Sequence, residues 1–345
     1  MRSRLSRSLV AVTAAAVMAA VPACGGATDA PTGGSDTIPL TLQTFPGALL
    51  YISDVIAQQE GIFKRNGLDV TFVNPGDGAT AMRLLANGDA QGLLADVASG
   101  ISAASKGQPI GVTGSVINKS LFQVSARGDL LGVKGDWKAK VQALRGKKVG
   151  VPGIGSSGDI VMRGLLREAG LTPDKDVTLI SITTGQAAIA QFQQKALDAF
   201  INVAPTAHLI EKAGVGGLYV DIANEAPPKF SDSVIGMMTN RSFAKQNPEA
   251  LRRWMASEQQ AIEFIGKPAN RDKIIGYIAK NVTSNDVPLA EKLVDYLNNT
   301  AYSATKPGLE VPTQALNNQI ELLTAGGIAA DSLNASDFVV TPNRK

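Results

Sequence analysis

The chain has 345 residues, enough for two compact domains, and 44% of them are hydrophobic, enough for folded cores. Aromatic residues make up only 5%, and the formal net charge of +3 arises in the first 23 residues, which contain three arginines and no acid. The rest of the chain is balanced, with 30 basic and 30 acidic side chains, so a basic or ring-lined nucleic-acid-binding surface is excluded.

The chain begins with a pattern typical of an export signal. Three arginines precede an apolar run over 9–21, which is too short for a membrane span. The run ends in "VPAC", which resembles a bacterial lipobox apart from Pro22, and Cys24 is the only cysteine of the protein. We predict a signal peptide over 1–23 and lipidation of Cys24. Ordinary cleavage after Ala23 is the alternative.

A segment rich in Gly, Thr, Asp and Pro follows and predicts a flexible tether over 24–37. No later segment is long and apolar enough for a membrane span, so we expect an exported body held at the outer side of the cell membrane by its lipid. A lone cysteine excludes an intrachain disulfide and a cysteine-based metal site, and a single histidine, His208, excludes a histidine-rich one. We expect no metal and no cofactor.

From Ile38 onward, apolar runs alternate with helical patterns. Strands are predicted over 39–45, 68–73, 91–96, 109–116, 121–127, 147–153, 177–182, 197–202, 217–222 and 233–239. Helices are predicted between them over 48–60, 79–87, 97–106, 157–169, 186–195 and 205–213. After Thr239 only helical patterns remain, over 247–266, 270–280, 286–300 and 312–325. This alternation predicts an α/β fold with mainly parallel sheet and a helical C-terminal tail.

The number of strands exceeds what one sheet with a single switch point would hold. We therefore predict two α/β lobes, with the chain crossing between them near 124–130 and 224–232. Lobe I then consists of 38–125 and 226–345, and lobe II of 126–225.

The most suggestive short motif is "KVGVPGIGSSGDIVMRGLLREAG", with Gly153, Gly155 and Gly158 in G-x-G-x-x-G spacing. A dinucleotide site also requires an acid at the end of the following strand, about 20 residues beyond the glycines. Here that strand is "VTLISITTG", which ends without an acid. We instead expect free amides and the hydroxyls of Ser156 and Ser157 to face a negative or strongly polar group. A serine that only caps the helix is the alternative.

Polar residues follow several other strands in the same way. In open α/β sheets, ligands lie beyond the carboxyl ends of the strands, so these residues have a shared reason to converge. Phe45 or Tyr51 would cover an apolar part of the ligand. The predicted ligand-binding residues are Thr44, Phe45, Tyr51, Gly78, Asp96, Ser115, Ser156, Ser157, Gly185, Gln186 and Asn202.

Patterns of known catalytic sites are scarce. The G-x-S-x-G and G-K-[ST] motifs do not occur, and His208 lies in a helical pattern with no acid or serine motif around it. Asp77 and Asp96 could act as acid and base, although solvated turns explain them equally well. We therefore expect a protein that is not an enzyme.

Five segments together resemble one family. They are "IAQQEGIFKRNGLDVTFV" (56–73), "LLANGDAQGLLAD" (84–96), "LRGKKVGVPGIGSSGDIVMRGLLREAGL" (144–171), "QAAIAQFQQKALDAFINVAPTAHLIEKAG" (186–214) and "TNRSFAKQNPEALRRWMASEQQAIEFI" (239–265). In this order they resemble the substrate-binding proteins of bacterial ABC importers of the nitrate/sulfonate/taurine and thiamine-precursor type. The resemblance implies a two-lobed type II periplasmic-binding-protein fold that closes on a small solute. It also implies an ABC permease and its ATPase as partners, and we expect a monomer.

The resemblance leaves the solute open. The serine–glycine helix start favours a small organic anion such as a sulfonate or carboxylate, whereas Asp77 and Asp96 favour an amine or a pyrimidine, as in a thiamine precursor. The pyrimidine synthases of related fold use their own histidine and carry a cysteine-rich motif, which this chain lacks. An exported enzyme acting in the same cleft and a sensing subunit are further alternatives.

Overall fold

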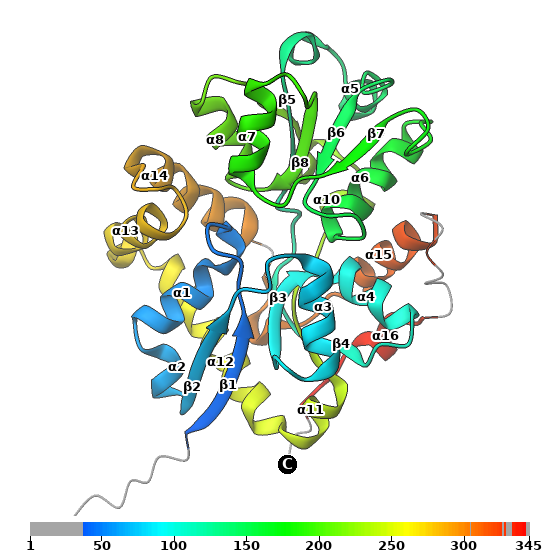
Figure 1. Ribbon diagram of the computed structural model, residues 1–345. Coiled ribbons are helices and arrows are strands. Elements are labelled where there is room, and N and C mark those ends of the chain that lie inside the picture. Colours follow the sequence, from blue (N-terminus) through cyan, green and yellow to red (C-terminus); the bar gives the residue numbers. More distant parts are fainter. Residues whose placement is uncertain (1–36, 304, 326–327, 329–332, 343–345) are drawn as a thin grey trace, which may run out of the picture. The chain divides into compact units, whose positions relative to one another are not determined.

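The structure is a computed structural model that describes residues 37–303, 305–325, 328 and 333–342 (Figure 1). The predicted signal peptide, Cys24 and the tether as far as residue 36 lie outside the described residues, so the hypotheses about them stay predictions. In the described part of the chain, no helix combines the length and apolar character needed to cross a membrane.

Two five-stranded sheets form the framework of the described residues. Sheet A has the strand order β2-β1-β3-β10-β4, and sheet B has the order β7-β6-β8-β5-β9. The strands are β1 (Ile38–Gln43), β2 (Leu68–Val73), β3 (Gly92–Asp96), β4 (Ile110–Ile117), β5 (Phe122–Ala126), β6 (Lys148–Val151), β7 (Thr178–Ser181), β8 (Ala199–Val203), β9 (Gly217–Asp221) and β10 (Ile235–Asn240). All ten lie where the apolar runs predict them, to within two residues at each end.

Each sheet is mixed, with one strand opposed to the other four. In sheet A, β1 is parallel to β2 and β3, whereas β10 is antiparallel to β3 and β4. In sheet B, β6 is parallel to β7 and β8, whereas β5 is antiparallel to β8 and β9. The opposed strand is the one that the chain enters on leaving the other sheet. The mainly parallel α/β fold is thus confirmed, with β5 and β10 as its antiparallel members.

Helices flank both sheets (Figure 1). The predicted helices are present as α1 (Ile52–Gln59), α3 (Gly78–Asn87), α4 (Val97–Ser105), α6 (Ser157–Glu168), α7 (Gly185–Gln193), α8 (Thr206–Lys212), α12 (Pro248–Gly266), α13 (Arg271–Asn281), α14 (Val287–Tyr296) and α15 (Thr313–Ala325). Short helices that the sequence pattern did not indicate are α2 (Ile62–Arg65), α5 (Trp137–Gln142), α9 (Ile222–Glu225), α10 (Pro228–Ser231), α11 (Arg241–Gln246) and α16 (Ala335–Phe338). Most of these are single turns, too short to show helical periodicity.

The chain passes from sheet A to sheet B at 118–121 and returns at 232–234. The two connections are joined by an ion pair between Lys119 and Asp232 at 2.6 Å and by a hydrogen bond from Ser120 N to Ser231 O at 2.9 Å. The first crossing therefore lies a few residues before the predicted 124–130, because the buried run of β5 pairs with β8 and β9 in sheet B. The division into lobes itself stays a prediction.

The cores follow the sheets, and one helix joins them. A large apolar cluster surrounds sheet A and includes the fully buried Trp254 of α12, and a second and a third cluster pack against sheet B. Helix α15 contributes Leu316 and Leu323 to the first cluster but Leu322 to the second, where it packs with Phe230. It is thus held by both cores.

Candidate functional site

A cavity of about 580 Å³ lies where strand ends of both sheets meet. Asp96 at the end of β3 lines it from sheet A, and Asn202 near the end of β8 lines it from sheet B. Pro152 and Thr183, which follow β6 and β7, complete that side. This is the position beyond the carboxyl ends of the strands at which α/β proteins hold their ligands.

The beginnings of α3, α6, α7 and α8 border this cavity, through Gly78, Ser157, Gly185 and Thr206. The amides of a helix's first turn have no acceptor within the helix, and the helix dipole makes this end partially positive. Several such ends around one cavity favour a negatively charged or strongly polar group without requiring a basic side chain.

Side chains next to the cavity cap these helices. Asp77 Oδ1 accepts from Thr80 N at 2.8 Å at the start of α3, and Thr184 Oγ1 accepts from Ala187 N at 3.1 Å at the start of α7. Ser156 Oγ likewise accepts from Asp159 N at 3.3 Å. Ser156 therefore caps α6 and also lines the cavity, so whether it has a binding role as well stays a prediction.

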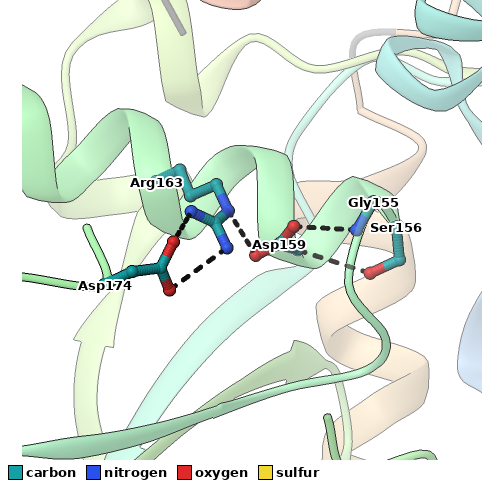
Figure 2. A network of polar contacts seen from close by, with 5 residues as sticks. All are labelled: Gly155, Ser156, Asp159, Arg163 and Asp174. Atoms are coloured by element: carbon teal, nitrogen blue, oxygen red, sulfur yellow. Dashed lines mark hydrogen bonds and ion pairs between the residues drawn. The ribbon is translucent and has the colours of Figure 1, made fainter. Parts of the chain in front are cut away.

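The glycine-rich loop before α6 is shaped by a charged network on the side of sheet B (Figure 2). Gly155 has a left-handed φ of 83°, and its amide donates to Asp159 Oδ2 at 2.8 Å. Asp159 is 3% exposed and also accepts from Arg163 Nε at 2.8 Å, while Arg163 Nη1 donates to Asp174 at 2.5 Å. The amide of Gly155 and the charge of Arg163 are thus already engaged within the protein. Like the missing acid after the next strand, this argues against a dinucleotide site.

Two acids border the cavity, and both are engaged in hydrogen bonds. Asp96 is 4% exposed and accepts from Ala98 N and from Ser233 Oγ. Burial raises the pKa of Asp96 to about 6, against the lowering effect of these two bonds. The pKa of Asp77 is lowered, chiefly by the backbone amide of Thr80 and then by the Thr80 hydroxyl.

Part of the cavity lining on the side of sheet A is apolar. The rings of Phe45 and Tyr51 lie with centroids 6.0 Å apart, and Met82 and Leu93 continue this surface. The cavity therefore has an apolar surface on one side and polar helix starts on the other. This combination suits a small organic molecule more than a bare inorganic ion.

The structure brings together most of the residues that the sequence predicted for the site. Those that line the cavity are Phe45, Tyr51, Gly78, Asp96, Ser156, Ser157, Gly185, Gln186 and Asn202. Thr44 instead borders a neighbouring pocket of about 200 Å³. Ser115 is fully buried within β4, and its hydroxyl donates to Asn118 Oδ1 at 2.5 Å. The prediction that Ser115 lines the cavity was wrong, because β4 is buried throughout its length and the chain leaves for sheet B at 118–121. A binding role for the others stays a prediction.

Some lining residues were missed by the sequence reasoning. Asn74, Ser99 and Thr206 lie next to strands or helix starts that the pattern did identify, so a wider window around each strand end would have included them. Ser284 comes from the helical tail between α13 and α14, and no local signal indicated it.

Basic residues are absent from the described lining of the cavity, which contains no lysine, arginine or histidine. His208 lies on α8 next to lining residues but does not line the cavity itself. Its Nδ1 is buried without a hydrogen-bond partner among the described residues, and burial is the main cause of its lowered pKa.

Comparison with known proteins identifies the family. The NMT1/THI5-like family matches residues 51–270. A curated relative, 4-amino-5-hydroxymethyl-2-methylpyrimidine phosphate synthase THI11 of Saccharomyces cerevisiae, is 23% identical over 62% of this chain, and the match spans only 63% of that relative's length.

Solved structures share the fold at low sequence identity. The alkanesulfonate-binding protein SsuA from Xanthomonas axonopodis pv. citri, bound to MOPS, superimposes with a TM-score of 0.69 at 17% identity, covering 88% of this chain and 98% of SsuA. The periplasmic nitrate-binding protein NrtA from Synechocystis PCC 6803 gives 0.64 at 14% identity, covering 90% and 92%. The expected periplasmic-binding-protein fold is thereby confirmed.

Proposed function

Because this chain belongs to the NMT1/THI5-like family and has the fold of solute-binding proteins, we propose that it is an exported lipoprotein that captures a small organic anion for an ABC transporter. The anion, sulfonate-like or carboxylate-like, would lie in the cavity between the strand ends of the two sheets. Lipidation at Cys24 would keep the protein at the outer side of the cell membrane, close to the permease and its ATPase.

The observation that carries this proposal is the set of helix beginnings around the cavity. Ser157, Gly185 and Thr206 each begin a helix there, so first-turn amides provide donors for an anionic group. The Ser157 hydroxyl donates to Asp96 O at 3.4 Å in this structure. The apolar wall with Phe45 and Tyr51 would cover the carbon part of the same solute.

The acids of the lining weaken the case for an amine in this part of the cavity. Asp77 uses both carboxylate oxygens on Thr80, and Asp96 uses its own on Ala98 and Ser233. Both therefore act as helix caps, with few acceptor positions left for a ligand.

Binding would act through closure. A solute that contacts both walls of the cavity stabilises the arrangement in which they are close, and the paired connections at 118–121 and 232–234 would be where the chain bends. A permease could then distinguish loaded from empty protein by this arrangement.

A pyrimidine or thiamine precursor is the alternative ligand, supported by the name of the yeast relative. The side-chain amides of Gln186 and Asn202 offer both donors and acceptors, which suit the ring nitrogens and amino group of a heterocycle. An exported enzyme in the same cleft would have to work without His208, and Asp96 would be its best acid–base candidate.

The test is a thermal-shift screen of the mature protein with sulfonates, carboxylates, nitrate and pyrimidines. We expect stabilisation by one class of organic anion. Ser157→Asp should abolish it by placing a negative charge at the start of α6, while an added acid in a helix's first turn is compatible with folding.

Ser242→Asp is the matched control, since Ser242 is exposed in the first turn of α11 and away from the cavity. A panel without any shift would contradict the binding proposal. A pyrimidine shift that survives Ser157→Asp would favour the alternative ligand.

A further inference from the structure

Two buried carboxyl groups lie outside the part of the cavity considered so far. Asp54 on α1 is 2% exposed, and Glu258 on α12 is fully buried. Burial is the main cause that raises the pKa of both, and Glu258 raises that of Asp54 further. Two neighbouring carboxyls in an apolar core resist ionising together, so the pair keeps a proton to a higher pH than free carboxyl groups do.

Nothing basic compensates this pair. The titratable groups that face it from the adjoining segments are Tyr51 and Tyr302, whose own pKa values burial raises first of all. Ser53 and Trp254 also lie beside Glu258 and lower its pKa. No lysine, arginine or histidine is among the groups that shift the pair within the described residues.

The polar side chains of this cluster do not form well-aligned hydrogen bonds with one another. Asp54 Oδ1, both carboxyl oxygens of Glu258, Ser53 Oγ and Tyr302 OH make no hydrogen bond of ordinary geometry within the described residues, although Asp54, Ser53 and Trp254 lie close enough to Glu258 to lower its pKa. Buried oxygens of this kind are costly unless something binds them.

Asp54 also borders an opening. It lines the side pocket of about 200 Å³, together with Thr44, Phe72 and Asn281. The side pocket and the main cavity share six lining residues, namely Phe45, Pro46, Gly47, Ala48, Tyr51 and Val282. A carboxyl group surrounded by aromatic rings, without any basic residue in the lining, is the environment that recognises organic cations.

We propose that the side pocket is a subsite for an ammonium or amidinium group, with Asp54 as its counter-ion and Glu258 as the neighbour that shares its proton. When an ammonium ion enters, Asp54 becomes a carboxylate, and its proton passes to Glu258 if Glu258 is ionised and to solvent if Glu258 is already protonated. When a neutral amine enters, it takes that proton and becomes the ammonium ion itself. No other bond is made or broken.

This inference deepens the proposed function, because the group would belong to the solute in the main cavity. A solute that reaches both places carries an anionic end at the helix beginnings and a cationic end at Asp54. The subsite can nevertheless be tested alone with simple ions.

The test measures thermal shifts of the mature protein with methylammonium, ethylammonium and propylammonium chloride against sodium chloride at equal ionic strength. We expect stabilisation that grows as the pH rises, since the carboxylate form is the one that binds the cation. Asp54→Asn should weaken the apparent affinity by about tenfold or more, as expected for a hydrogen bond to a charged group. Asp69→Asn, on the exposed face of β2, is the matched control and should leave the shift unchanged.

A second measurement on the unaltered chain covers the case in which Asp54→Asn does not fold. On the wild-type protein, ethylammonium chloride should raise the melting temperature more than sodium chloride at equal ionic strength, whereas the neutral alcohol 1-propanol should not raise it. Equal stabilisation of wild type and Asp54→Asn, or the same shift of the wild-type protein with 1-propanol, would overturn the subsite. Failure here leaves the anion screen unaffected, because plain sulfonates should still stabilise Asp54→Asn and not Ser157→Asp.

Discussion

Asp96 is the residue for which the structure gives the clearest pH dependence. Its pKa is raised to about 6 by burial, compared with 3.8 for an ordinary aspartate. The folded state therefore holds a proton that the unfolded state has already lost between these two values. Stability from this group is fully present below about pH 4, is lost as pH rises through about 6, and amounts to about 3 kcal/mol for a shift of this size.

Asp96→Asn tests this effect, because asparagine keeps a cap for α4 but does not titrate. We expect the free energy of unfolding of wild type, relative to Asp96→Asn, to fall by about 3 kcal/mol between pH 4 and pH 8 in urea titrations. Asp69→Asn serves as the exposed control. A difference between wild type and Asp96→Asn that does not change with pH would show that the carboxylate is not destabilised by burial.

At the scale of elements, two mid-helix glycines make a matched pair. Gly276 in α13 is exposed and has nothing within 4 Å of an added Cβ, so Gly276→Ala should stabilise the protein by about 1 kcal/mol through helix propensity. In α6, a Cβ at Gly164 would lie 2.3 Å from Leu322 Cδ1 and 2.9 Å from Phe230 Cε1. The overpacking caused by Gly164→Ala should cost about 1–3 kcal/mol. This cost outweighs the gain in helix propensity, so Gly164→Ala should destabilise the protein.

Urea unfolding of both variants checks this contrast. Opposite signs are expected, because α6 is packed against α15 and α10 and the Gly276 face of α13 is not packed. If Gly164→Ala were as stabilising as Gly276→Ala, the close packing of α15 on α6, and with it the attachment of α15 to both cores, would be disproved.

The elements also show how far the sequence alone could lead. Apolar runs located every strand because each run is long enough to be buried in a sheet, and helix starts such as Ser156 carried their own capping signal. Pairing is not local, however, so β5 could not be assigned to sheet B from its own residues. For the same reason Ser115 was placed in the site, although both faces of β4 are covered. Ser284, Asp54 and Glu258 meet their neighbours only in three dimensions.

At the scale of the whole described body, an ion pair between residues that do not line the cavity connects its two sides. Lys212 at the end of α8, beside sheet B, lies 2.6 Å from Asp286, which caps the start of α14 in the core of sheet A (Figure 1). Opening of the cavity would separate these charges. In the proposed closure, the pair would therefore stabilise the closed arrangement without touching the solute.

Lys212→Gln should consequently weaken solute binding by up to about fivefold, the modest effect of an exposed pair. The affinity loss should disappear at high salt, where the wild-type pair is screened as well. Titration calorimetry with the solute identified in the thermal screen measures the affinity, and small-angle scattering measures the accompanying expansion of the unliganded protein. Lys140→Gln breaks the Lys140–Glu225 pair, which joins α5 and α9 beside sheet B alone, and should change neither quantity. Equal effects of the two variants would mean that charge loss, not the link across the cavity, governs binding. An unchanged affinity for Lys212→Gln would mean that closure depends on the solute and the connections at 118–121 and 232–234 alone.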